Sequence, residues 1–378
     1  MITALLTIPD NFQEARVPKR LLVLLWLIAP AASLAGGASS GDAIPVLGKY
    51  TAPNSDADGK PRGISGMGCL GTSSDPTREC LVINDEETSG EIVLLGKDGL
   101  RPTGKPVTFT HKKDPIDGIV GSEQKANCGE TGKYGDLDGE TVAIENKVDR
   151  TYVYVVGSHS CSGGGKYKAS NYLLVRFKPA SAVSFVGTGD PVIERSFRVA
   201  DLLLLTPELH DAYGRPKGQG TNIEGLAVIG ETLYAGMRTP VDNGTSFIAS
   251  ARTDDLFAPG HEPLKAVGTP IRLSLGTNTG IRDLAALADG GLLILSGPTT
   301  SQADVGYKIW YLPKPLSTSV PVELVTVTTN AKPKTEAEVA KAESITVTSE
   351  SEDRVTVIVN YDNIDEGAPA SHQLQIGR

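Results

Sequence analysis

The chain has 378 residues, and 45 Asp and Glu against 36 Lys and Arg give it a formal net charge of −9 at pH 7. An acidic chain with no basic stripe argues against nucleic acid and against anionic membranes as partners. Glycine (42) and proline (24) are frequent, aromatic residues make up 5%, and short runs rich in Val, Ile, Leu, Tyr and Thr recur between turn residues. This pattern predicts an all-β protein, with helices only at 199–214 and 335–343.

The N-terminus has the layout of a secretory signal peptide. Basic residues precede an apolar run at 21–29, and the small residues Ser33 and Ala35 lie at the −3 and −1 positions of a cleavage site. The run is shorter than the roughly 20 residues that a membrane span needs, although an uncleaved anchor is the alternative. We therefore expect residues 1–35 to be a signal peptide. The mature protein is expected in the periplasm or outside the cell, with no attachment to the membrane.

The four cysteines are expected to form two disulfides. Their number is even, all four follow the signal peptide, and an exported protein meets an oxidising compartment. Cys69 and Cys80 flank one tight loop, so we expect them to pair and Cys128 to pair with Cys161. A zinc site is disfavoured, because the chain contains no C-x-x-C pair.

A local motif recurs five times along the chain. Each copy begins with a polar or acidic residue, followed by a glycine or small apolar residue, a short strand, a turn and a second apolar strand. The five openings are Ser65-Gly66, Asp138-Gly139, Glu224-Gly225, Asp283-Leu284 and Glu343-Ser344, at spacings of 73, 86, 59 and 60 residues. The repeat predicts a β-propeller of four-stranded antiparallel blades. We expect five blades in a single domain over 36–378, or six if the longest interval contains a degenerate blade. Segment 43–51 is expected to close the ring against 371–377.

The repeat also predicts where charged residues gather. In a propeller blade, the start of the first strand and the end of the second lie on the same face. The strand openings would bring together Asp136, Asp138, Glu140, Glu224, Asp283 and Glu343, and the second strands would add Asp85, Glu86, His159, Arg238, Asn360 and Asp362. Crowded carboxylates repel unless a cation or a ligand balances them, and hard oxygen ligands suit Ca²⁺. We therefore consider a calcium site at Asp138, Glu224 and Asp283. The alternative is that these side chains only cap turns and that Arg282 neutralises a neighbouring carboxylate.

Several of these segments resemble a known family. The sequences "NIEGLAV", "GIRDLA", "DLDGE" and "YVVGSHS" are similar to motifs of the bacterial domain of unknown function 3616 family, over about residues 63–362. That family is similar in turn to esterase-like, phytase-type propeller proteins of exported bacterial proteomes. The resemblance implies the propeller fold and a bacterial origin, and it brings no settled activity. The shared positions are Asp138, Gly139, Glu140, Gly157, Ser158, His159, Asn222, Glu224, Gly225, Arg282 and Asp283.

Two classes of function fit these observations. The first is a metal-assisted hydrolase of phosphoesters or esters, in which Arg238 and Arg282 clamp the substrate and His159 is the general acid or base. The substrate would contact Asp138, Glu140, Asn222, Glu224 and Asp283. The second is a non-catalytic propeller that binds a small molecule, a peptide or another protein. In either case we expect a monomer.

Overall fold

The computed structural model describes residues 37–50, 63–111, 118–132, 134–147, 150–216, 218–332 and 340–377. The predicted signal peptide, residues 1–35, lies outside this part of the chain. Within the described residues, no helix is both long and apolar enough to cross a bilayer.

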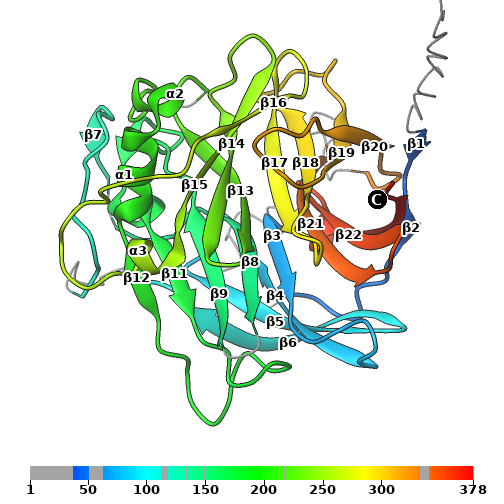
Figure 1. Ribbon diagram of the computed structural model, residues 1–378. Helices are drawn as coiled ribbons and strands as arrows, with labels where there is room; N and C mark the ends of the chain where they lie inside the picture. The colour runs from blue at the N-terminus through cyan, green and yellow to red at the C-terminus, as the bar shows by residue number, and fades with distance from the viewer. Residues whose placement is uncertain are drawn as a thin grey trace, which may run out of the picture. The chain divides into compact units, whose positions relative to one another are not determined.

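Five antiparallel sheets are arranged around a central axis and form a five-bladed β-propeller (Figure 1), which confirms the predicted fold. In each blade the first strand is innermost. The strands, in blade order from the axis outward, are β3 (Gly66–Cys69), β4 (Thr77–Ile83), β5 (Ser89–Gly96) and β6 (Gly99–Thr108); β8 (Gly139–Lys147), β9 (Arg150–Gly157), β11 (Leu174–Phe177) and β12 (Glu194–Ser196); β13 (Asn222–Ile229), β14 (Thr232–Thr239), β15 (Thr245–Arg252) and β16 (Ile271–Ser274); β17 (Thr279–Ala286), β18 (Leu292–Pro298), β19 (Tyr307–Leu312) and β20 (Val322–Val327); and β21 (Lys341–Glu350), β22 (Arg354–Asp362) and β23 (Ala370–Gln375).

The N-terminal segment completes the last blades of the ring. Strand β2 (Asp42–Ala43) pairs antiparallel with β23, with Asp42 opposite Ser371, and becomes the fourth strand of the fifth blade. Strand β1 (Ala38–Ser39) adds a parallel edge to β20 of the fourth blade. The two ends of the described chain therefore meet, as the blue and red strands of Figure 1 show. The predicted register is wrong, because the paired residues are 42–43 rather than 43–51, and Val46 forms a bridge with Leu100 of the first blade instead.

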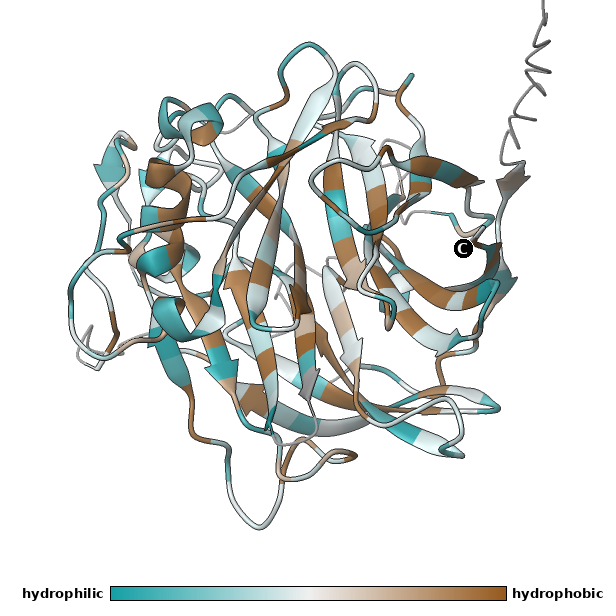
Figure 2. Ribbon diagram, viewed as in Figure 1, coloured by the Kyte–Doolittle hydropathy of each residue, from teal (hydrophilic) through white to brown (hydrophobic). Residues whose placement is uncertain are grey.

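Close packing of the inner strands explains the glycine in the repeated motif. A Cβ atom on Gly66 would lie 2.7 Å from the Cα of Thr141 in the next blade, and one on Gly225 would lie 2.8 Å from Cγ of Leu284. A side chain at either position would push neighbouring inner strands apart. Apolar residues fill the space between the blades, and Figure 2 shows them concentrated in the strands and in the helix beside β15.

Three short helices and a few small elements lie outside the blades. They are α1 (Arg198–Leu205), α2 (Pro207–His210), α3 (Thr253–Leu256), the 3₁₀ turns η1 (Ala169–Tyr172) and η2 (Asp365–Gly367), and a parallel pair of β7 (Glu130–Thr131) and β10 (Lys166–Tyr167). The helix predicted at 199–214 is divided in two, because the backbone of Thr206 is extended before Pro207, as proline requires of its predecessor. The helix predicted at 335–343 is wrong at its end, where residues 341–343 belong to β21. Residues 335–339 lie outside the described part.

Both predicted disulfides are present. Cys69 and Cys80 face each other across the first two strands of the first blade, and Cys128 is bonded to Cys161 in the loops of the second blade. None of the cysteines described is free.

Candidate functional site

A pocket of about 70 Å³ opens at one mouth of the central channel. We refer to it as the acidic pocket. Its lining residues come from four of the five blades and are Asp85, Asp138, Glu140, Ser160, Asn222, Glu224, Arg238, Lys341, Glu343 and Asp362. The volume has room for a few water-sized groups, so a larger ligand would enter with one end only.

A β-bulge in each of four inner strands sets the direction of one charged side chain. The register of β8, β13, β17 and β21 against its neighbour shifts at Glu140, Glu224, Arg282 and Glu343, respectively. A bulge re-aims the extra residue, and here the four bulged residues lie around the mouth of the channel. The structural equivalent of Glu224 in the fourth blade is therefore Arg282. The sequence motif aligned Asp283 with Glu224 and is wrong there by one residue. It also aligned Asp138 with Glu224, whereas the equivalent residue of the second blade is Glu140.

Three of these bulged residues form a chain of ion pairs. Nη1 of Arg282 lies 2.8 Å from Oε2 of Glu224, and Nη2 of Arg282 pairs with Oε1 of Glu343. The other oxygen of Glu224 accepts hydrogen bonds from Nη1 of Arg238 at 2.6 Å and from Nδ2 of Asn222 at 3.1 Å. Burial disfavours the charge of Arg282, which is 1% exposed, but Glu224 and Glu343 outweigh it and raise its pKa. Both arginines are thus engaged by carboxylates.

The fifth blade contributes a second ion pair and a carboxyl group with a shifted pKa. Nζ of Lys341 lies 2.9 Å from Oδ2 of Asp362. Burial raises the pKa of Glu343 to about 7; Arg282 opposes the shift, and the carboxylate of Asp362 adds to it. Burial therefore favours the protonated form of Glu343, and Arg282 favours its carboxylate.

Asp85 and Glu140 differ from the other acidic lining residues. The side chain of neither one makes a hydrogen bond or an ion pair with any residue that the structure describes. Burial raises the pKa of both, and the nearby carboxylates raise it further, with Asp138 the main contributor for Asp85 and Glu224 for Glu140. Both carboxyl groups therefore retain a proton to a higher pH than exposed carboxyl groups do.

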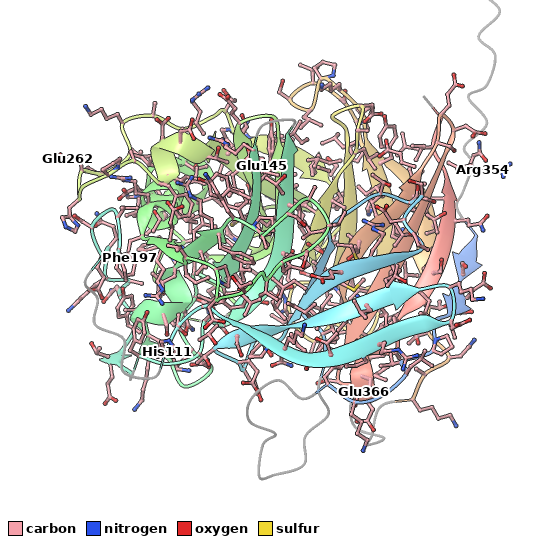
Figure 3. All side chains as sticks on the ribbon, turned by 90° about the horizontal axis from the view of Figure 1, so that it is seen from below. His111, Glu145, Phe197, Glu262, Arg354 and Glu366 are labelled. Atoms are coloured by element: carbon pink, nitrogen blue, oxygen red, sulfur yellow. A yellow bond between two sulfur atoms is a disulfide. The ribbon has the colours of Figure 1, made fainter. Side chains whose placement is uncertain are left out.

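A buried carboxylate elsewhere in β8 shows the contrast. Glu145, labelled in Figure 3, accepts hydrogen bonds from the hydroxyl of Tyr154 at 2.7 Å and from Nη2 of Arg150 at 2.9 Å. Its charge is balanced within the blade, as expected of a carboxylate that serves the fold. Glu140, five residues earlier on the same strand, has no such partners within the described chain.

Neighbours hold Asp138 at the rim of the acidic pocket. Its backbone is in the left-handed region, with φ of 53°, which is uncommon for a residue other than glycine. Its Oδ2 accepts hydrogen bonds from the hydroxyl of Ser158 and from Nδ2 of Asn171, the latter at 3.0 Å. These contacts fix the orientation of the carboxylate.

His159 is buried outside the lining of the acidic pocket. Its Nδ1 lies 2.9 Å from the carbonyl oxygen of Gly157, its ring packs edge-on against Tyr172, and no part of it is exposed. Because a carbonyl oxygen only accepts hydrogen bonds, Nδ1 carries the proton of the neutral ring. Burial lowers the pKa of His159 to about 4. The side chain is thus neutral at pH 7, and it does not line the acidic pocket.

Asp283 also lies outside the lining, and it connects three inner strands. Its Oδ1 accepts a hydrogen bond from the hydroxyl of Thr141 in β8 at 2.6 Å, and its Oδ2 accepts one from the backbone N–H of Ile345 in β21 at 2.8 Å. The backbone N–H of Leu284 donates to Oδ1 as well. Burial raises the pKa of Asp283, while these hydrogen bonds oppose the shift. Both oxygens of this carboxyl group therefore accept hydrogen bonds from the inner strands.

The remaining predicted residues are distributed around the pocket rather than in it. Asp136 is paired with Lys168 at 3.0 Å, Glu86 is exposed, and Asn360 is buried beside Ser344. Two lining residues, Ser160 and Lys341, were not predicted. Lys341 could have been found, because residues two apart on a strand point to the same side: Lys341 and Glu343 repeat the spacing of Asn222 and Glu224.

The three residues predicted to bind calcium do not converge. Glu224 is paired with two arginines, and Asp283 is enclosed by its own hydrogen bonds. Among the residues described, no group of three or more His, Cys, Asp or Glu side chains is arranged to hold a metal ion. The donor set therefore does not fit Ca²⁺.

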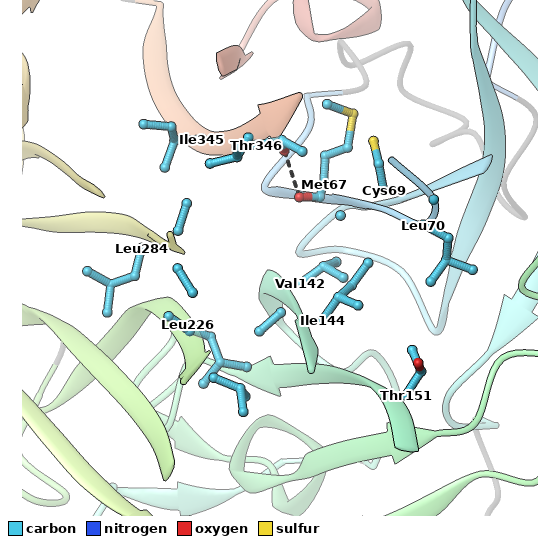
Figure 4. Close-up of a pocket in the computed structure, with 18 of the residues that line it drawn as sticks. Met67, Cys69, Leu70, Val142, Ile144, Thr151, Leu226, Leu284, Ile345 and Thr346 are labelled. Atoms are coloured by element: carbon cyan, nitrogen blue, oxygen red, sulfur yellow. Dashed lines mark hydrogen bonds between the residues drawn. The ribbon is translucent and has the colours of Figure 1, made fainter. Parts of the chain in front are cut away.

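A second cavity, of about 180 Å³, lies in the central channel beyond the acidic pocket (Figure 4). Its walls include Met67, Val142, Leu226, Leu284 and Ile345. These residues come from the five inner strands, and they are apolar, whereas the acidic pocket is lined by polar side chains alone. The two ends of the channel thus differ in chemical character.

The fold and this pocket define the class: a five-bladed propeller with an acidic pocket at one mouth of its channel. Residues 214–374 match the model of a family described as "Protein of unknown function (DUF3616)". The match covers the third to fifth blades and confirms the resemblance to that family in this part of the chain. No curated protein matches the chain.

Solved structures with a similar arrangement of strands include enzymes that act on sugars. A levansucrase from B. megaterium has a TM-score of 0.48 and 12% identity, and 90% of each chain is covered. A levansucrase from Bacillus subtilis has a TM-score of 0.47 and 9% identity, with 87% of this chain and 90% of that chain covered. An α-L-arabinofuranosidase from Lactobacillus brevis has a TM-score of 0.44 and 10% identity, with 84% and 91% covered. At these values the likeness carries no argument about activity.

Proposed function

We propose that the protein is an exported hydrolase that cleaves an uncharged ester bond in the acidic pocket, with Glu140 as the proton donor and Asp138 as the base. One observation carries the proposal: Glu140 has no partner among the described residues, and it lines the same pocket as Asp138, whose orientation is fixed by its neighbours. A carboxyl group without partners is free to exchange a proton with a ligand. An oriented carboxylate beside it can accept one from water.

The chemistry requires two proton transfers. Asp138 would take a proton from a water molecule as the water attacks the carbonyl carbon of the ester. The bond between that carbon and the leaving oxygen would break as Glu140 gives its proton to the oxygen, so that an acid and an alcohol leave. Burial raises the pKa of Glu140, which supports its protonated form near neutral pH. Exchange with solvent then restores both groups.

The charge of the pocket favours an uncharged ester over a phosphoester. Arg238 and Arg282, the groups that would clamp a phosphate, are already paired with Glu224. Six of the ten lining residues carry a carboxyl group, and their field repels an anionic substrate. Because the donor set does not fit Ca²⁺, the proposed steps use the residues of the chain alone.

The two disulfides support the proposed location. Disulfides persist in secreted and periplasmic proteins and are rare in the cytosol. Their presence is compatible with export, and it supports the interpretation of residues 1–35 as a signal peptide.

A substrate panel tests this function. Purified protein would be assayed with small uncharged esters, lactones and phosphomonoesters, with EDTA and with added CaCl₂. We expect turnover of an ester or a lactone that neither addition changes. Loss of activity in EDTA would replace the proposal with a metal-assisted mechanism. Ligand binding with no turnover across the panel would favour the non-catalytic alternative.

A further inference from the structure

The groups left open in the acidic pocket are mainly hydrogen-bond acceptors. Asp85 has no partner for its carboxyl group within the described chain. Asn222, which is 8% exposed, uses its Nδ2 to donate to Glu224, and its Oδ1 is buried with no hydrogen bond. A buried carbonyl oxygen without a donor costs free energy, and a donor on a ligand would remove that cost.

The residues at the four bulged positions show that positive charge is lacking on one side of the channel mouth. Arg282 lies between Glu224 and Glu343 and forms an ion pair with each. The equivalent position in the second blade is Glu140, so that side of the ring has an acid where the fourth blade has a cation. Asp85 and Glu140 belong to the first and second blades, next to each other in the ring.

Among the residues that line the acidic pocket, one buried guanidinium N–H donor is open as well. Nε of Arg238 makes no hydrogen bond, although the charge of its guanidinium is countered by Glu224. The pocket thus offers two kinds of open group: acceptors, which are the carboxyl groups of Asp85 and Glu140 and the amide oxygen of Asn222, and one N–H donor, Nε of Arg238. A ligand that satisfies them has several N–H donors, a positive charge and one acceptor oxygen.

We propose that the ligand of the acidic pocket carries an ammonium group, which lies between Asp85 and Oδ1 of Asn222, and an oxygen atom that accepts a hydrogen bond from Arg238. The inference rests on the proposed function, and it narrows the substrate to esters that bear an amine, with the ester carbonyl as the acceptor. An ammonium group suits the cavity of about 70 Å³, since it is about the size of one water molecule. A metal ion suits it less, because the described residues include no set of ligands for one.

The protonation of Asp85 supports this assignment. Burial and the neighbouring carboxylates raise the pKa of Asp85 in the free protein. A bound cation would favour the charged carboxylate, so binding would release a proton. The affinity for an amine is therefore expected to rise with pH until Asp85 is ionised in the free protein.

Calorimetric titration with ethanolamine hydrochloride tests the inference, because this probe has an ammonium group, an oxygen acceptor and no ester. We expect saturable binding at pH 7 that weakens at pH 5, and at least 10-fold weaker binding by both Asp85→Asn and Asn222→Leu. Asp136→Asn is the matched control, since Asp136 pairs with Lys168 outside the pocket, and its affinity should equal that of the unmodified protein. Ethylene glycol, of the same size but uncharged, should not bind.

The outcomes separate this inference from the proposed function. Binding of ethanolamine without hydrolysis of any ester keeps the ammonium site and refutes the hydrolase. Hydrolysis of neutral esters with no binding of ethanolamine refutes the ammonium site and keeps the hydrolase. Equal affinity in all three variants, or binding of CaCl₂ in preference to ethanolamine, would also overturn the inference. Circular dichroism melting curves establish whether each variant is folded. If Asn222→Leu does not fold, the affinity of Asp85→Asn, which preserves the shape of the side chain, decides the test.

Discussion

Arg282 of the fourth blade and Glu224 of the third occupy equivalent bulged positions, and their side chains pair with each other at 2.8 Å. The same guanidinium also binds Glu343, so three inner strands are joined by one buried cation. The second blade has Glu140 at this position. The four bulged positions therefore hold one cation and three acids, and the acid of the second blade, Glu140, has no ion-pair partner among the described residues.

Arg282→Met should destabilise the fold strongly. The change would leave Glu224 and Glu343 buried beside an apolar side chain, and removing one partner of a buried ion pair costs about 3–5 kcal/mol. Denaturant unfolding at pH 7 measures the loss. Arg252→Met is the matched control, because Arg252 and its partner Glu231 are 58% and 47% exposed, and such surface pairs contribute about 0–1 kcal/mol. Equal losses in the two variants would contradict the role given to Arg282.

Asp283→Asn should lower stability without weakening ligand binding. An amide at this position would place its N–H₂ group against the backbone N–H of Leu284 or that of Ile345, and this buried donor would lose its partner. The expected cost is about 1–3 kcal/mol. Thermal melting measures the cost, and titration with ethanolamine measures the binding. Loss of binding in a variant that melts normally would place Asp283 in the site after all.

His159 should make the protein less stable in acid. Its pKa in the folded protein is about 4, whereas an unfolded chain has about 6.5, so the unfolded state binds more protons between these values. The contribution is complete above pH 6.5 and is lost as the pH falls towards 4, by about 3 kcal/mol in total. His159→Asn removes the titration and keeps a residue that tolerates a positive φ. The dependence of unfolding free energy on pH should be flatter in this variant, and identical slopes would contradict the assignment.

The exported protein should begin at Gly36. Mass spectrometry of the secreted or periplasmic protein would show this N-terminus, and thiol reagents should label no cysteine before reduction, because all four are bonded. A mass that retains residues 1–35 would refute the cleavage.

Much of this fold could be predicted because its signals are local. The glycines of the motif lie where neighbouring inner strands are too close for a side chain, so this close packing is visible in the sequence. In a blade the first strand begins on the face where the second strand ends, and this rule grouped several residues that line the acidic pocket: Asp138, Glu140, Glu224, Arg238 and Asp362.

The direction of individual side chains could not be predicted in the same way. A bulge shifts the register by one residue, and a shift of one residue sends a side chain to the other face of the strand. For this reason Arg282 lies beside the acidic pocket, and Asp283 is turned towards Thr141. His159 was expected at the site because it follows the second strand, but the left-handed backbone at φ 53° accompanies a ring packed against Tyr172.

The most direct test of the central claim, that Glu140 is the proton donor, is to measure the hydrolysis of an amine-bearing ester by the Glu140→Gln variant. Glutamine has the shape of the glutamic acid and no proton to give, so the variant should fold normally and lose at least about 100-fold in kcat, as expected when a general acid is removed. Asp136→Asn, changed outside the pocket, should keep the full rate. A Glu140→Gln variant that hydrolyses the ester as fast as the unmodified protein would contradict the account.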